Sequence, residues 1–192
     1  MERISSETLL NTLEEKVEKH LHDAVDVFQN LDAETLLKPA PNGGWSIAQC
    51  LEHLNRYGDY YLPEVGKKMD QHHKTPASPW FKSTWIGHHF TRMMDPTTGK
   101  TKLPAFKSYK PQPALDAHGV VAKFILQQEK LLVLLRDARN TDLNSVRIPV
   151  SIARFISLKV GDVFQFLIAH NERHVLQAKR HLVGELALGI RP

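Results

Sequence analysis

The chain has 192 residues, of which 42% are hydrophobic and 24% are charged, and its formal net charge is +4 at pH 7 with neutral histidines. This length and composition are typical of an ordinary globular protein with a substantial core, so we expect a single domain over residues 1–192. The positive charge is modest and includes no dense block of Lys and Arg, which argues against a nucleic-acid partner.

Membrane and secreted classes are also disfavoured by the sequence. The longest apolar run, residues 131–135, is far too short to span a bilayer, and the amino terminus has no apolar signal core. A single cysteine, Cys50, excludes an intrachain disulfide. We therefore expect a cytoplasmic protein without a membrane partner.

The first predicted element is an amphipathic helix over about residues 6–30. Its apolar residues recur at helical spacing, which indicates one buried face. The polar residues between them, including His20 and His22, are expected on the outer face. The apolar stripe consists of Leu9, Leu10, Leu13, Val17, Leu21, Ala24 and Phe28.

The second predicted helix begins at Ser46 with unusually clear signals. Ser46 and Gln49 have the spacing of a capping box, and Trp45 and Cys50 have that of a hydrophobic staple. Pro63 is expected to kink this helix without ending it. The buried stripe continues through Ile47, Cys50, Leu51, Leu54, Tyr57 and Tyr61.

Two further helices are predicted, over about residues 113–138 and from Gly161-Asp162 onward. Asp162 and Gln165 would cap the last helix, and Gly184 is a plausible stop. Residues 145–150 are the only weak strand candidate. Four long helices with little strand predict an all-α, up-down four-helix bundle, in which metal sites are built from side chains on facing helices.

A long insert, residues 71–112, separates the second and third predicted helices. It contains the aromatic residues Trp80, Phe81, Trp85 and Phe90 and a candidate short helix that would pack on the bundle. One hypothesis is that the insert forms a lid over a partly apolar site, with Lys82 and Arg92 nearby to attract an anion. The alternative is that it only covers apolar surface.

Three histidines form the candidate functional site. His170 and His174 are four residues apart, so they project from one face of the last helix, and His53 lies on the second helix. Three imidazoles can bind one divalent cation and leave coordination positions for water or substrate, which is typical of a catalytic metal site. The alternatives are that His170 and His174 lie on a solvated face and that His53 is a hydrogen-bonded core residue. Glu172, between the last two histidines, is expected to be exposed or to support a ligand.

These motifs resemble the DinB-like superfamily, which includes YfiT-like metal-dependent hydrolases. The resemblance lies in Gly44-Trp45-Ser46-Ile47, in Glu52-His53-Leu54, and in the run from His170 to Gln177. It implies a four-helix bundle whose three histidines, His53, His170 and His174, hold a divalent metal ion. Nickel or zinc is the expected ion, with iron or manganese as alternatives. It also implies a homodimer and a small-molecule substrate, with a low-molecular-weight thiol as a candidate.

The sequence therefore predicts a metal-dependent enzyme acting on small molecules. Water or a thiol at the three-histidine site would be the nucleophile, and no catalytic side chain is assigned. A thiol S-transferase is slightly favoured over a hydrolase, on the resemblance alone. The alternative is a non-catalytic helical bundle that binds a small molecule or serves a stress response and carries a vestigial metal site.

Overall fold

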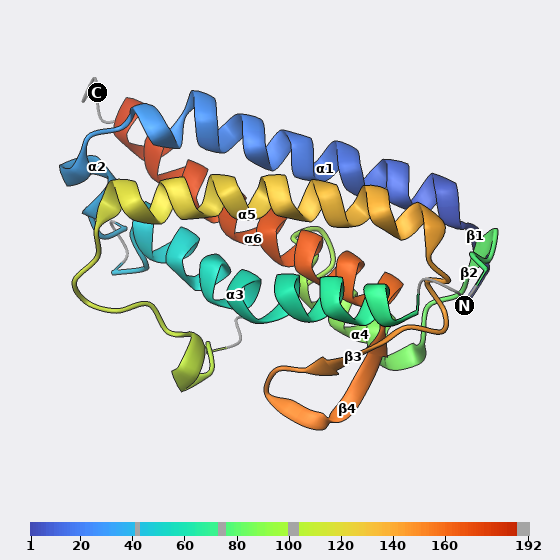
Figure 1. Cartoon of the computed structure of the whole chain (residues 1–192). Helices are drawn as coiled ribbons and strands as arrows, with labels where there is room; N and C mark the ends of the chain where they lie inside the picture. Colours follow the sequence, from blue (N-terminus) through green and yellow to red (C-terminus); the bar gives the residue numbers. More distant parts are fainter. Residues whose placement is uncertain (41–42, 73–75, 100–103, 188–192) are drawn as a thin grey trace.

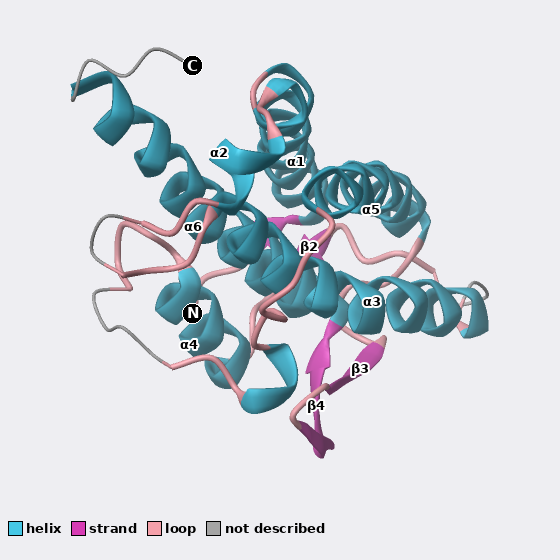
Figure 2. Ribbon diagram, turned by 90° about the vertical axis from the view of Figure 1, so that its left-hand side faces the viewer, coloured by secondary structure: helices cyan, strands magenta, loops and turns pink. Residues whose placement is uncertain are grey.

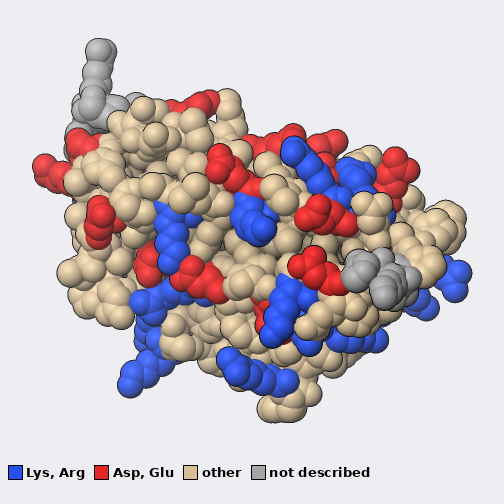
Figure 3. Space-filling view, viewed as in Figure 1, with Lys and Arg blue, Asp and Glu red and all other residues tan. Residues whose placement is uncertain are grey.

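The computed structural model describes residues 1–40, 43–72, 76–99 and 104–187. Its framework is a bundle of long helices, as the sequence predicts (Figure 1). None of the described helices has the length and apolarity needed to cross a bilayer. Acidic and basic side chains are interspersed over the face drawn in Figure 3. The long helices are α1 (Ser6–Asp26), α3 (Ile47–Gln71), α5 (Ala117–Asp137) and α6 (Val160–Ala187).

The helices do not alternate in direction as a simple up-down bundle would. α1 and α3 each pack against both α5 and α6. On α3 and α5, Asn55 bonds to Val120 and Asp59 bonds to Lys123, so the residue numbers rise together and these two helices run in the same direction (Figure 1). The predicted up-down order is therefore wrong at this point, because the long connection between α3 and α5 returns the chain to the end where α3 began.

The start of α3 follows the sequence prediction. The Ser46 side chain accepts a hydrogen bond from the backbone N–H of Gln49, and the Gln49 side chain accepts one from the backbone N–H of Ser46. Pro63 lies inside the helix, as expected. In contrast, α5 begins at Ala117 rather than near residue 113, because the Asp116 side chain caps it by accepting from the Gly119 N–H.

The amino-terminal half also holds short helical segments. α1 ends at Asp26, and a 3₁₀ turn over Phe28–Asn30 completes the segment predicted as one helix. A short helix, α2 (Ala33–Leu37), is capped by Asp32 and packs on α3 and α5.

A β-hairpin leads directly into α6. The weak strand candidate is confirmed as β3 (Arg147–Val150), and it pairs antiparallel with β4 (Ala153–Lys159), which the sequence analysis missed. The hairpin projects away from the bundle (Figures 1 and 2). Because α6 begins at Val160, Asp162 is inside the first turn and is not a cap. Gly184 does not stop the helix, which continues to Ala187.

The connection between α3 and α5 contains β2 (Trp80–Phe81), which pairs with β1 (Ile4–Ser5), and the predicted short helix, α4 (Trp85–Met94). α4 packs on α6 (Figure 2). The Asp162 carboxylate holds the start of α4, because it accepts hydrogen bonds from Ser83 and Thr84. The expected aromatic packing is only half correct: Phe81 is buried and Phe90 packs partly on the core, but Trp80 is 53% exposed and Trp85 is 74% exposed.

The interior consists of two apolar clusters with buried polar residues between them. One cluster includes Val17, Tyr61, Leu131 and Phe164, and the other includes Ala24, Leu51, Phe124 and Val175. On each long helix, polar side chains interrupt the apolar sequence where one cluster gives way to the other. This polar layer consists of His20, Asp23, His53, Asn55, Gln128, His170 and Asn171.

Candidate metal centre

The structure brings His53, His170 and His174 together. The candidate ligand nitrogens of the three rings all lie within 4.8 Å of one another. The Nε2 atoms of His53 and His170 are 3.1 Å apart. His53 and His170 are buried, whereas His174 is partly exposed. Of the three rings, that of His174 is therefore the one nearest to solvent.

Local structure places each ring. The capping box at Ser46 fixes where α3 begins, and His53 follows about two turns later on the side that packs against α6. α6 carries His170 and His174 one turn apart, which places both rings over the same face. Because α3 and α6 pack directly, the single ring from α3 meets the pair from α6.

Two of the rings are held in a defined tautomer. Nδ1 of His53 lies 2.7 Å from the Tyr109 carbonyl oxygen, and Nδ1 of His174 lies 3.0 Å from Oε1 of Gln177. Both oxygens can only accept, so each Nδ1 carries the proton and each Nε2 keeps its lone pair. Such outer partners orient histidine ligands in metal sites.

His170 differs from the other two histidines. Its Nδ1 atom is buried and has no hydrogen-bond partner among the described residues. Its Nε2 atom lies 3.1 Å from the Nε2 atom of His53, which carries a lone pair. Without a cation, the Nε2–H group of His170 would therefore donate a hydrogen bond to that lone pair.

The surroundings keep the three imidazoles neutral. Burial lowers the pKa of His170 well below its usual value, and the neighbouring His174 and His53 lower it further. Burial likewise lowers the pKa of His174 to about 3, and burial also lowers the pKa of His53. Metal ligation requires neutral imidazole, so the protonation state suits a ligand set.

The donor set therefore fits a divalent cation. Three neutral imidazoles converge, and two of them present Nε2 lone pairs fixed by their Nδ1 partners. Imidazole nitrogen suits zinc, nickel, copper and iron alike. Three protein ligands would leave positions open for a small molecule.

Aromatic rings enclose the cluster. Trp45 lies beside His53, with ring centroids 4.8 Å apart, and Tyr57 meets His170 edge-on at 4.6 Å. Tyr109 stacks on Tyr57 at 4.0 Å, and Phe166 stacks on His170 at 5.8 Å. Any substrate at the open positions would therefore meet a largely aromatic wall.

The carboxylates near the cluster are already paired. Glu52 accepts a hydrogen bond from Arg56, and Glu172 accepts from Lys19 and from His20. His20 is fully buried, so its predicted position on the outer face is wrong. The hydrogen bond from His20 is the main reason why the pKa of Glu172 falls to about 2. Glu172 therefore joins α1 to α6 and contacts none of the three histidines of the cluster, so it has neither of its two expected roles.

The insert contacts the cluster directly at one place, where the Tyr109 carbonyl of its last turn, Lys107–Tyr109, bonds to His53. Phe90 of α4 lies near Phe166, beside the cluster, with the two ring centroids 6.3 Å apart. Arg92 is not at the cluster: together with Trp85, His88, His89 and neighbouring residues, it lines a separate open cavity of about 340 Å³. The lid hypothesis therefore fits the turn at Lys107–Tyr109 better than the aromatic residues that suggested it.

Sequence reasoning missed several residues around the site. Tyr57 lies one turn after His53 on the same helix, where the sequence indicates only its place in the apolar stripe. Tyr109 lies in an insert without periodic pattern, and it contributes a backbone carbonyl, so no sequence signal could have identified it. Cys50 is a buried core residue, as expected, and burial raises the pKa of its thiol to about 12.

Comparisons with known proteins bear on the family and the fold of the chain. The family model described as the DinB superfamily matches residues 16–178. YfiT from Bacillus subtilis, described as a probable metal-dependent hydrolase with an unusual four-helix bundle topology, has a similar structure, with a TM-score of 0.54. The two chains are 15% identical over 97% of this chain and 89% of that chain, which shows a common fold. No curated protein sequence matches this chain.

Proposed function

The chain belongs to the DinB superfamily, and on that premise we propose that it is a metal-dependent enzyme that acts on a small molecule, with His53, His170 and His174 as the metal ligands. The observation that carries the proposal is the convergence of three neutral imidazoles, two of which have Nδ1 bonded to a fixed oxygen acceptor. A purely structural cluster would explain the contact between His53 and His170, but it would not require the Nε2 lone pair of His174 to be presented at the same place.

The expected chemistry is attack by an activated nucleophile on a small electrophile. A bound divalent cation would lower the pKa of water or of a thiol toward neutrality. The protein would hold the rings and exclude bulk water, since His53 and His170 are buried behind Tyr57 and Phe166.

Thiol S-transfer is our first choice of reaction, and hydrolysis is the second. Glu52 and Glu172 are both engaged in ion pairs, so neither is free to act as a base toward water. A thiol has a much lower pKa than water and depends less on such a base. Hydrolysis is supported by the description of YfiT, a protein with the same fold.

The substrate side of the proposal rests on the aromatic wall. Trp45, Tyr57 and Tyr109 would favour a small, partly apolar electrophile, with a low-molecular-weight thiol as the second substrate. We also propose that the protein is a homodimer, which light scattering coupled to gel filtration would test.

The first experiment is metal analysis of protein purified without a nickel column. We expect about one divalent ion per chain, most readily nickel or zinc, and loss of that ion in variants of the three histidines. Turnover of thiol with a model electrophile, against ester or amide hydrolysis, then separates the two reactions. Metal binding without either activity would favour the non-catalytic alternative, and protein without metal affinity would contradict the proposal.

A further inference from the structure

The Tyr109 carbonyl that fixes His53 belongs to a turn with few other anchors in the described structure. Lys107–Tyr109 forms a single 3₁₀ turn in the connection that leads to α5. A turn of this kind does not hold a carbonyl in one place by itself, because it contributes little hydrogen bonding of its own. The position of the Tyr109 oxygen must therefore come from contacts with the bundle.

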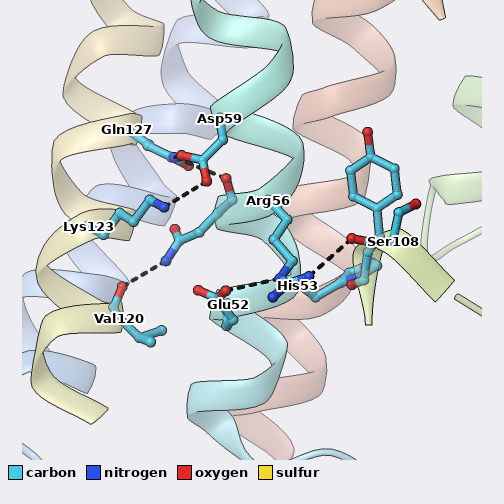
Figure 4. A network of polar contacts seen from close by, with 10 residues as sticks. Glu52, His53, Arg56, Asp59, Ser108, Val120, Lys123 and Gln127 are labelled. Atoms are coloured by element: carbon cyan, nitrogen blue, oxygen red, sulfur yellow. Dashed lines mark hydrogen bonds and ion pairs between the residues drawn. The ribbon is translucent and has the colours of Figure 1, made fainter. Parts of the chain in front are cut away.

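Arg56 provides the polar contact. Its Nε atom donates to Oε1 of Glu52 at 3.0 Å, and its Nη1 atom donates to the Ser108 carbonyl oxygen at 3.1 Å (Figure 4). The carboxylate of Glu52, one turn earlier on α3, fixes the guanidinium, and the guanidinium in turn fixes the residue preceding Tyr109. The planar, rigid fork of donors in Arg suits such a bridge between two acceptors.

Tyr57 provides the apolar contact. Its ring stacks on the Tyr109 ring, with the centroids 4.0 Å apart, and Tyr57 directly follows Arg56 on α3. Arg56 and Tyr57 therefore hold the turn by its backbone and by its aromatic side chain. Since Tyr57 also touches His170, it is part of the site wall, and Arg56 is the better residue for isolating the effect of the turn.

We propose that Arg56 is a positioning residue for the histidine cluster: by holding the Lys107–Tyr109 turn, it places the Tyr109 carbonyl so that His53 keeps its Nδ1–H tautomer and directs the Nε2 lone pair at His170 and His174. The consequence for metal affinity rests on the proposed function. The consequence for the tautomer does not, because it concerns the protein without metal. Removing an outer partner of a histidine ligand typically lowers metal affinity by roughly 10- to 100-fold.

The test compares Arg56→Gln with Lys123→Ala. Gln keeps much of the side-chain length but lacks the guanidinium fork. Lys123 forms an exposed ion pair with Asp59, one turn farther along α3, and does not touch the turn (Figure 4). Three quantities are measured in each protein. The His53 tautomer without metal comes from the ¹⁵N shifts of its imidazole in long-range correlation spectra. The zinc dissociation constant comes from competition with a chromogenic chelator, and the visible spectrum is recorded for the cobalt-substituted protein.

In the parent protein and in Lys123→Ala, we expect His53 as the Nδ1–H tautomer and equal zinc affinities. In Arg56→Gln, we expect a mixture of tautomers, a zinc dissociation constant raised roughly 10- to 100-fold, and an altered visible spectrum of the cobalt-substituted protein. Arg56→Lys keeps the charge but not the fork of donors. Its tautomer mixture and its zinc dissociation constant should lie between those of the parent protein and those of Arg56→Gln.

A folded Arg56→Gln variant with an unchanged tautomer and unchanged zinc affinity would overturn the proposal. If neither Arg56 variant folds, Arg56 serves the stability of the fold and the proposal is equally overturned. If the parent protein binds no zinc, the proposed function fails, but the tautomers of the metal-free proteins still decide whether Arg56 positions His53.

Discussion

The Nε2 atom of His20 lies 2.7 Å from Oε2 of Glu172, so α1 is bonded to α6 in the turn that carries His170 and His174. The imidazole is fully buried, whereas Glu172 is partly exposed and also pairs with the exposed Lys19. This contact joins α1 to α6, which run in the same direction. It lies in the polar layer between the two apolar clusters. It connects the stability of the bundle to the placement of the candidate ligands.

Replacing His20 by Phe should destabilise the fold by about 1–3 kcal/mol, because the Glu172 carboxylate loses a charge-assisted hydrogen bond while an aromatic ring of similar size remains. The measurement is urea unfolding of the metal-free protein. The matched control is Lys19→Ala, which removes only the exposed partner and should cost less than about 1 kcal/mol. Equal losses of unfolding free energy in the two variants would show that the buried contact contributes no more to stability than the exposed one.

Glu172 also gives a prediction about acid. Its pKa is lowered from 4.5 to about 2 in the folded protein, first because of the hydrogen bond from His20. A carboxyl group with a depressed folded pKa stabilises the fold above its unfolded pKa, and this stability is lost as the pH falls through the folded pKa. The difference in unfolding free energy between the parent and Glu172→Gln should therefore shrink from pH 6 to pH 2. A difference that stays constant over this range would contradict the assignment.

His170→Ala should abolish stoichiometric metal binding while the helical circular dichroism signal survives. The bundle has two apolar clusters that do not include the three histidines, so we expect the chain to fold without a bound ion. Isothermal titration with zinc or nickel measures the first effect, and His89→Ala, at an exposed position on α4, is the control. Unfolding of the parent on metal removal would instead indicate a structural metal site.

Gly87 and Gly66 should respond in opposite ways to alanine. At Gly87, on α4, an added Cβ would overlap with the Asp162 carboxylate, which Ser83 and Thr84 hold in place, so we expect a loss of about 1–3 kcal/mol. At Gly66, inside α3, the nearest atom is Cδ2 of Leu134 at 3.4 Å, an ordinary contact. Alanine there should stabilise the fold by about 0.5–1 kcal/mol through helix propensity.

Thermal or urea unfolding of both glycine variants tests the docking of α4 on α6. If Gly87→Ala is as stable as the parent, α4 does not pack as closely on Asp162 as described. The control at Gly66 shows whether the assay resolves changes of this size.

The long helices and the three candidate ligands can be predicted from the sequence alone. Helical periodicity and the Ser46–Gln49 capping box are local signals, and they correctly placed the long helices and the start of α3. The spacing of His170 and His174 likewise required only the geometry of one helix. The sequence also offers His53 as the third ligand, the family resemblance supports that assignment, and the structure brings its ring to the other two.

The tertiary structure decided what depends on residues far apart in the chain. The parallel run of α3 and α5 follows from the path of the long connection, and the burial of His20 follows from its meeting with Glu172, 152 positions later. The Tyr109 carbonyl that orients His53 is a backbone group in an irregular turn. A residue type says nothing about where such a group points, because every residue carries the same carbonyl, and only packing against Arg56 and Tyr57 gives it a direction.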